Sequence, residues 1–388
     1  MGYDDNDIST DDFIALCREV GAEPFITINP TWNTPAESGA WVEYCNGDTS
    51  TSFGRIRADR GFAEPYNVRL WSLGNEFGHG HMEGANTPES YARLAAEHGK
   101  RMLAASPDLP LELCSSGPYP NEQWVERSAR ALASVARTVS QHYYGYAPQY
   151  TGADSDREEY LHSLSSVEKV RRFIRELHRQ LTTVKEDVLV DQDLLVFVDL
   201  AEGLSHRQTL SADTQISISF DEWNVWNAWY RPSSISDGIY TALFLHMLME
   251  ESGPCSVSIA CHFQAVNEGL ISVTPEEGAK LTAEGQIFRA MANHAGGKLL
   301  SISSNAAVSE GEDGTVTATV VNDSWDEELT VVLPGACECS EGVLYTGESV
   351  LPPSRFEETD VRSEAISGKI VLPPHSVLLL RSTVTRNI

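Results

Sequence analysis

Basic residues are scarce in this sequence. Lysine and arginine total 28 against 56 aspartates and glutamates, the formal net charge is -28, and there are only six lysines in 388 residues. Such a charge repels nucleic acid and anionic membranes, so we expect neither as a partner. Two interpretations stay open: an ordinary acidic protein, or a halophilic cytosolic protein whose carboxylates keep its surface hydrated in high salt. We favour the second, because acid excess and lysine scarcity coincide.

Long apolar runs are also missing. No stretch reaches the roughly 18 residues that a membrane span requires, and residues 1–7 are acidic and polar, unlike a secretory signal. We therefore expect a soluble, cytoplasmic protein. The seven cysteines, an odd number, are typical of reduced thiols. Cys337 and Cys339 form one close pair, which is a weak metal signal without a second cluster. We expect no metal and no cofactor.

Strand-like and helix-like segments alternate over most of the chain. The apolar strand segments end near Asn29, Glu76, Ser115, His142, Phe220 and Phe263. This order predicts a parallel sheet with right-handed crossovers. Polar groups at the carboxyl ends of the strands favour a TIM-type barrel over a doubly wound open sheet, for which no G-x-G-x-x-G or phosphate loop is present. A polar loop is expected after the helix that begins at Thr34. Residues 184–214 look like an insertion into the alternating pattern.

The pattern changes near residue 300. Segments 315–322 and 328–333 alternate apolar and polar residues with period two and are separated by turn-forming residues, and segment 368–380 is expected to form a strand, a turn and a strand. They predict a C-terminal antiparallel β-sandwich. We therefore divide the chain into a barrel domain, residues 1–298, and a sandwich domain, residues 299–388.

Two strand ends carry acidic residues that suggest chemistry. Segment 68–76 (VRLWSLGNE) ends in Glu76, and segment 218–226 (ISFDEWNVW) places the acidic pair Asp221 and Glu222 directly after an apolar run that we expect to stop at Phe220. Catalytic groups of barrel enzymes lie at the carboxyl ends of strands. Two carboxylates there are the minimum that cleavage of a glycosidic bond requires.

Segments 73–76 (LGNE) and 220–226 (FDEWNVW) resemble the acid/base and nucleophile motifs of glycoside hydrolase family 51, mostly intracellular α-L-arabinofuranosidases. The likeness extends over nearly the whole chain. It implies a (β/α)8 barrel followed by a sandwich, with Glu76 as general acid/base and Glu222 as nucleophile of a retaining mechanism. It also implies that Asn75 binds the sugar 2-hydroxyl.

Four more residues are assigned through the same resemblance. His142 and Tyr144 match a His-x-Tyr motif in which the histidine contacts the sugar and the tyrosine hydrogen-bonds the nucleophile. Gln264 matches a glutamine near the nucleophile. Trp226 is expected either to line the sugar pocket or to pack in the core.

The sequence departs from the family at two places. Segment 77–83 (FGHGHME) replaces the usual Gly-Pro-Trp-Gln, which leaves the leaving-group side undefined. Its His79 and His81 have no third ligand at a plausible spacing, so a metal site is not favoured. We also count six barrel strands, so the resemblance implies a barrel lacking its first two strands. Either the chain is N-terminally truncated or a separate chain completes the barrel; a homo-oligomer stays open.

The predicted function is that of a retaining glycoside hydrolase. It would release terminal non-reducing α-L-arabinofuranosyl residues from arabinose-containing oligosaccharides. The alternatives are another retaining barrel glycosidase, acting on β-glucans or xylosides, and an inactive truncated fragment. The sequence predicts neither the natural substrate nor the oligomeric state, and it leaves the activity of the chain alone open.

Overall fold

The computed structural model describes residues 7–78, 85–117, 122–146, 155–190, 215–226, 232–267, 269–276, 278–332, 341–351, 361–366 and 370–383. It divides into two compact units. The first unit comprises Met1–Gln141 and Glu176–Ser219, and the second comprises His142–Arg175 and Phe220–Ile388.

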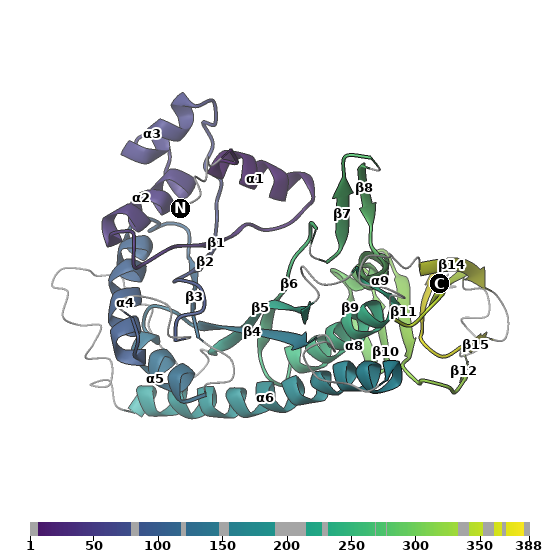
Figure 1. Cartoon of the computed structure of the whole chain (residues 1–388). Coiled ribbons are helices and arrows are strands. Elements are labelled where there is room, and N and C mark those ends of the chain that lie inside the picture. Colours follow the sequence, from purple (N-terminus) through teal and green to yellow (C-terminus); the bar gives the residue numbers. More distant parts are fainter. Residues whose placement is uncertain are drawn as a thin grey trace, which may run out of the picture. The chain divides into compact units, whose positions relative to one another are not determined.

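The first unit alternates short strands with helices (Figure 1). Its complete elements are α1 (Thr10–Glu19), β1 (Phe25–Thr27), α2 (Pro35–Asn46), α3 (Ser52–Asp59), β2 (Leu70–Ser72), α4 (Pro88–Ala104), β3 (Glu112–Ser115) and α5 (Glu122–Leu132). Capping boxes at Ser9 and Thr34 begin α1 and α2, because each hydroxyl accepts from the N3 backbone while the N3 carboxylate accepts from the cap. The core lies between the strands and helices α2, α4 and α5, around Trp71 and Leu113.

Helix α3 corrects the prediction of a polar loop after α2. Thr51 caps the helix, accepting from Gly54 N at 3.1 Å. The fully buried Arg57 then donates to the backbone carbonyls of Tyr44 and Gly47. These contacts are made to α2 and to the residue that follows it, so they are tertiary. The local sequence of α3 has no apolar periodicity that would have predicted the helix.

The predicted α/β architecture is confirmed at the level of a parallel sheet with separate antiparallel sheets. Six strands are hydrogen-bonded in the chain order β1 to β6, and the pairs β1–β2, β2–β3 and β3–β4 are parallel. Strands β4 (Thr138–Tyr146) and β5 (Ser217–Trp226) continue past their expected ends. The prediction that the fifth strand stops at Phe220 is therefore wrong, and Glu222 lies within β5.

The second unit contains the remaining helices and strands. Its elements include α8 (Ile235–Ser252), β6 (Val257–His262), the hairpin β7 (Ile271–Thr274) and β8 (Gly278–Leu281), α9 (Ala283–Met291) and the 3-10 turn Ala292–His294. Helix α6 (Asp156–Val190) begins in this unit and is 35 residues long. It includes the first part of the predicted 184–214 insertion, of which residues 191–214 lie outside the described part.

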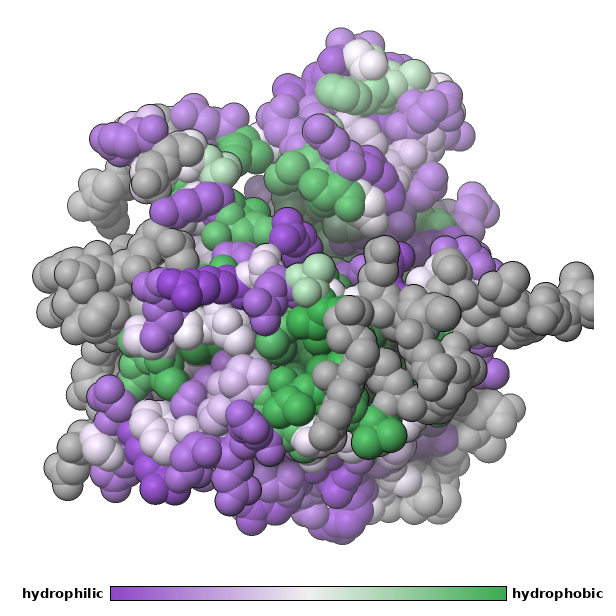
Figure 2. Space-filling view, turned by 90° about the vertical axis from the view of Figure 1, so that its right-hand side faces the viewer, coloured by the Kyte–Doolittle hydropathy of each residue, from purple (hydrophilic) through white to green (hydrophobic). Residues whose placement is uncertain are grey.

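The C-terminal part is antiparallel, as predicted. Its strands are β9 (Lys298–Ser303), β10 (Ala306–Glu310), β11 (Thr315–Asn322), β12 (Leu329–Val331), β13 (Glu341–Gly347), β14 (Val361–Ile366), β15 (Ile370–Leu372) and β16 (Ser376–Thr383). One sheet has the order β14-β13-β16-β11-β10-β9, and β12 pairs with β15. The sandwich arrangement and the boundary at residue 298 stay predictions. Figure 2 shows broad hydrophilic areas with apolar patches between them.

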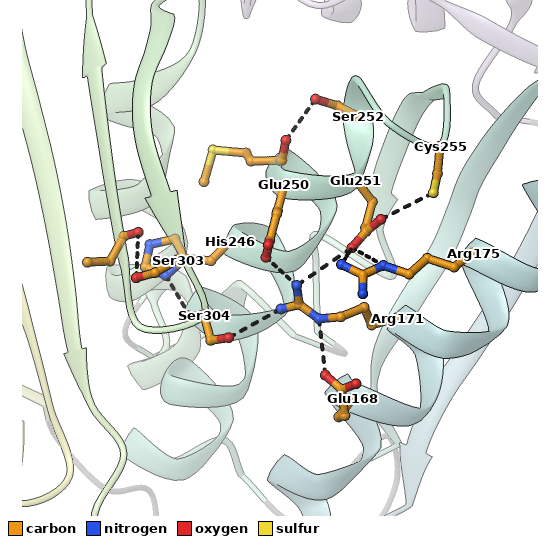
Figure 3. Close-up of polar contacts among 12 residues, drawn as sticks. Glu168, Arg171, Arg175, His246, Glu250, Glu251, Ser252, Cys255, Ser303 and Ser304 are labelled. Carbon is orange, nitrogen blue, oxygen red and sulfur yellow. Dashed lines mark hydrogen bonds and ion pairs between the residues drawn. The ribbon is translucent and has the colours of Figure 1, made fainter.

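A charge network around the buried Arg171 and Glu251 joins α6 to α8 in the second unit (Figure 3). Arg171, 7% exposed, pairs with Glu168, Glu250 and Glu251, and Arg175 also reaches Glu251 at 2.6 Å. The Glu251 side chain is only 1% exposed. Two guanidinium groups thus neutralise a buried carboxylate that would otherwise be costly to desolvate.

The sequence predicted that no segment spans a membrane and that the cysteines are reduced. Of the helices in the described ranges, none is long and apolar enough to cross a membrane. Within the described residues, no disulfide bond involves Cys17, Cys45, Cys114, Cys255 or Cys261. Cys337 and Cys339 lie outside the described residues.

Candidate active site

Glu76 lies on a tight turn four residues after β2 ends. Its backbone has a φ of 53°, in the left-handed region, and Gly74 before it has a φ of 112°. A side chain at Gly74 would collide with the ring of Phe77, because a Cβ there would lie 2.3 Å from Cε2. The turn therefore requires glycine at this position. It leaves Asn75 exposed and Glu76 half-buried.

Buried residues of the core fix the conformation of this turn. The Phe77 ring stacks on Tyr91 with centroids 4.9 Å apart, and Phe77 N donates to Ser116 Oγ at 3.1 Å. Tyr91 Oη donates to Leu73 O at 3.1 Å and accepts from Ser116 N at 2.6 Å. Burial raises the pKa of Tyr91, so its hydroxyl stays protonated and keeps donating. The backbone on both sides of Glu76 is thereby fixed.

Glu222 lies in the second unit and receives a short hydrogen bond. Tyr144 Oη donates to Glu222 Oε2 at 2.6 Å, from β4 to β5. His142, 7% exposed, places Nδ1 3.6 Å from the same oxygen and Nε2 3.4 Å from Asp221 Oδ1. Residues 142 and 144 share one face of β4 because side chains alternate along a strand. The half-buried Glu222 carboxylate is thus oriented by the phenol of Tyr144, and the His142 imidazole lies beside it.

Strand β6 is tied to β5 beside Glu222. Asn224 Nδ2 donates to Phe263 O at 2.7 Å, and Phe263 N donates to Trp223 O at 3.1 Å. Gln264 follows Phe263 through a cis peptide bond and is half-buried. The structure therefore places Gln264 directly after the residue that pairs with β5.

Three residues considered from the sequence lie outside this description. Trp226 is the last residue of β5, but its side chain is not among those described. His79 and His81 fall in the undescribed residues 79–84. Their proposed roles stay predictions.

The structure adds residues that the motifs did not identify. Asp221 was noted only as part of an acidic pair, yet its carboxylate is the second neighbour of His142. Ser116 and Tyr91 position the Glu76 turn from distant segments. For Asp221, its position beside Glu222 at the end of an apolar run was a sequence signal of a functional role. For Ser116 and Tyr91, no local sequence pattern could have indicated that they position the Glu76 turn.

Comparison with known proteins gives consistent results. The family model described as "Alpha-L-arabinofuranosidase 1 domain" matches residues 1–162. Probable α-L-arabinofuranosidase C of Aspergillus niger is 26% identical over 424 residues, covering 98% of this chain and 78% of that protein. The intracellular exo-α-(1->5)-L-arabinofuranosidase of Streptomyces lividans is 30% identical over 226 residues, covering 57% of this chain and 30% of that protein.

Solved structures show the same likeness across the whole chain. The α-L-arabinofuranosidase of Thermotoga maritima, in complex with arabinose, has a TM-score of 0.76 at 27% identity, covering 97% of this chain and 79% of that chain. The thermostable GH51 α-L-arabinofuranosidase of Thermotoga petrophila also has a TM-score of 0.76 at 27% identity, covering 96% and 78%.

Proposed function

We propose that this chain, which belongs to the α-L-arabinofuranosidases of glycoside hydrolase family 51, releases terminal non-reducing α-L-arabinofuranosyl residues with retention of configuration. Arabinose-containing oligosaccharides are its substrates. The observation that carries the proposal is the 2.6 Å hydrogen bond from Tyr144 of β4 to Glu222 in the FDEWNVW segment of β5. A carboxylate held by a phenolic donor is fixed in orientation and retains a second oxygen for attack.

The proposed reaction has two steps. Glu222 attacks the anomeric carbon while Glu76 donates a proton to the departing oxygen, giving a glycosyl-enzyme ester and the free alcohol. Glu76 then removes a proton from water, which attacks the same carbon and releases arabinose and the Glu222 carboxylate. Two inversions give net retention. Both steps require the two carboxyl groups to lie about 5 Å apart.

The remaining predicted residues bind the sugar in this proposal. The exposed Asn75 amide hydrogen-bonds the 2-hydroxyl, a contact that strengthens in the oxocarbenium-like transition state. His142 contacts the sugar from the same strand face as Tyr144. Gln264 lies near the nucleophile, and Trp226 offers a flat apolar surface to ring C–H groups.

We further propose a finer architecture for the sheets. The six-stranded sheet is part of a (β/α)8 barrel spanning residues 1–298, and residues 299–388 form a β-sandwich. Two further strands, from preceding chain or from a separate chain, complete the barrel. The support is the strand order and the resemblance to the family.

The substrate class is tested by comparing nitrophenyl α-L-arabinofuranoside with the corresponding xyloside and glucoside. We expect release of nitrophenol from the arabinofuranoside alone. Release from the xyloside or glucoside instead would favour the alternative of another retaining glycosidase. No release from any of them would favour the inactive fragment, and addition of the missing barrel strands should then restore turnover.

The nucleophile is tested by Glu222→Ala. Turnover should be abolished. Added azide should restore cleavage and give the arabinosyl azide of inverted configuration, because azide enters the space left by the Glu222 carboxylate and attacks the anomeric carbon from the same side. Glu276→Ala, which changes an exposed carboxylate after β7, is the matched control and should retain full activity. Full activity in Glu222→Ala would refute the assignment.

A further inference from the structure

The indole of Trp223, on β5, packs against two other elements of the second unit, α8 and β6. Trp223 directly follows Glu222 on β5 and has no exposed surface. Its ring stacks on Phe244 of α8 at 4.6 Å with an interplanar angle of 11°, and His262 of β6 meets it edge-on at 5.0 Å and 83°. The position of this indole is therefore set by where α8 and the His262 ring are held.

His262 is itself held by a buried carboxylate. His262 Nε2 and Glu284 Oε1 are 2.7 Å apart, with side chains 2% and 1% exposed. The fully buried Thr241 of α8 donates its hydroxyl to the same oxygen at 2.7 Å. Because an ionised carboxylate only accepts hydrogen bonds, His262 must carry its proton on Nε2. One oxygen of Glu284 thus joins α8, α9 and β6.

The location of Glu284 stabilises its negative charge. It lies in the first turn of α9, where the N-terminal end of the helix dipole stabilises a negative charge. Its backbone N also donates to Ser233 Oγ at 3.4 Å. The carboxylate is consequently fixed by its own helix as well as by its two donors.

Gly269, in the loop after β6, approaches the His262 ring too closely for a side chain at that position. A Cβ at Gly269 would lie 3.0 Å from His262 Cε1 and 2.7 Å from Gln264 O. Together with the Asn224 and Phe263 hydrogen bonds between β5 and β6, this packing confines the backbone around Glu222.

We propose that Glu284, His262 and Thr241 are positioning residues for the nucleophile, acting through Trp223. The inference rests on the proposed function, since Glu222 is taken as the nucleophile. None of the three touches Glu222 in any described contact. Their hydrogen bonds fix the indole of the next residue along β5, and a displacement of that indole moves the Glu222 backbone. A misplacement of about 1 Å at a reacting group costs about 100-fold in rate.

The test uses paired substitutions at Thr241. Thr241→Val keeps the shape and removes the donor, whereas Thr241→Ser keeps the donor. We expect kcat on nitrophenyl arabinofuranoside to fall about tenfold in Thr241→Val and in Glu284→Gln, with KM changed less than about twofold. Thr241→Ser should stay near the parent chain. All rates are measured well below the unfolding midpoint of each variant.

A matched control separates positioning from stability. Asn293→Ala removes hydrogen bonds to Arg289 O and Ala290 O at the other end of α9. It should lower the unfolding midpoint and leave kcat unchanged. If Thr241→Val and Glu284→Gln lowered the midpoint with unchanged kcat, the network would be structural only and the inference would be wrong.

Crystal structures provide a readout that does not need turnover. In Thr241→Val the Trp223 ring should shift and the Tyr144–Glu222 hydrogen bond should lengthen relative to the parent chain. Unchanged positions of both would overturn the inference even if the chain proved inactive. Lack of arabinofuranosidase activity in the parent chain, in contrast, would count against the proposed function alone.

Discussion

At the residue scale, Tyr144 is the polar contact that bears most directly on the nucleophile. Removing its hydroxyl in Tyr144→Phe leaves Glu222 Oε2 without its 2.6 Å donor. A hydrogen bond to a charged group contributes about 1.5–3 kcal/mol. We therefore expect kcat/KM on nitrophenyl arabinofuranoside to fall about 10- to 100-fold.

Tyr143→Phe is the control for this substitution. Tyr143 is the neighbour of Tyr144 on β4 and points to the opposite face of the strand. Loss of the Tyr143 hydroxyl should leave kcat/KM within about twofold, because this side chain lies on the face of β4 opposite to that of Tyr144. Equal losses in the two variants would show that the hydroxyl of Tyr144 has no special relation to Glu222.

The sequence identified the residues of the candidate site better than it identified their supports. Glu76, Glu222, His142 and Tyr144 stand in short motifs, so the resemblance could assign them roles. The side chains that hold them, such as Ser116 below the Glu76 turn, come from other segments and belong to no motif. Such contacts depend on which elements meet in the fold, and local sequence does not encode that.

At the element scale, helix starts were predictable because their signals are local. Ser9 and Thr34 each cap a helix with atoms from the next three residues. The extent of β5 was not predictable, because backbone pairing continues regardless of side-chain polarity. Phe263 N reaches Trp223 O after the two acidic residues that were expected to end the strand.

Two buried histidines connect the helices of the second unit to its antiparallel sheet. His246 Nδ1 lies 3.2 Å from Ser304 O (Figure 3) and must carry hydrogen, because a carbonyl only accepts. Its Nε2 then accepts from Thr319 Oγ1 at 2.8 Å, and Thr319 accepts from His294 Nε2 at 2.9 Å. His294 Nδ1 accepts from Ser309 at 2.7 Å. All of these hydrogen bonds can form together only when both imidazoles are neutral.

This network predicts a loss of stability in acid. Burial lowers the pKa of His246 and of His294 to about 4, from the ordinary 6.5. The unfolded chain therefore takes up protons first, and the contribution of each residue is complete above about pH 6.5 and is lost as pH falls toward 4. Each histidine should remove about 1 kcal/mol of unfolding free energy per pH unit within this window.

Urea unfolding at pH 7.5, 6.5 and 5.5 measures this slope. The double variant His246→Gln, His294→Gln should be less stable at pH 7.5 and should lose less stability per pH unit. His162→Gln, a change at an exposed residue of α6, is the control and should keep the parent slope. A double variant with the parent slope would show that the two histidines do not govern the acid response.

At the scale of the whole molecule, the net charge of -28 predicts a dependence of stability on salt. Like charges repel more strongly in the compact chain than in the unfolded one, and salt shortens the screening length from about 10 Å at 0.1 M to about 3 Å at 1 M. Since 1 kcal/mol corresponds to about 2–4 °C in a cooperative unit of about 150–250 residues, we expect the unfolding midpoint to rise about 5 °C between 0.1 and 1 M KCl.

A charge variant distinguishes screening from a general effect of salt on burial. Asp59→Asn, Glu64→Gln, Glu312→Gln and Glu364→Gln change exposed carboxylates in both units. The combined variant should have a higher midpoint than the parent chain at 0.1 M KCl, and the two midpoints should converge at 1 M. A parent midpoint that does not change with salt would favour the ordinary acidic protein over the halophilic one. An equal rise in both chains would assign the effect to burial of apolar surface rather than to charge.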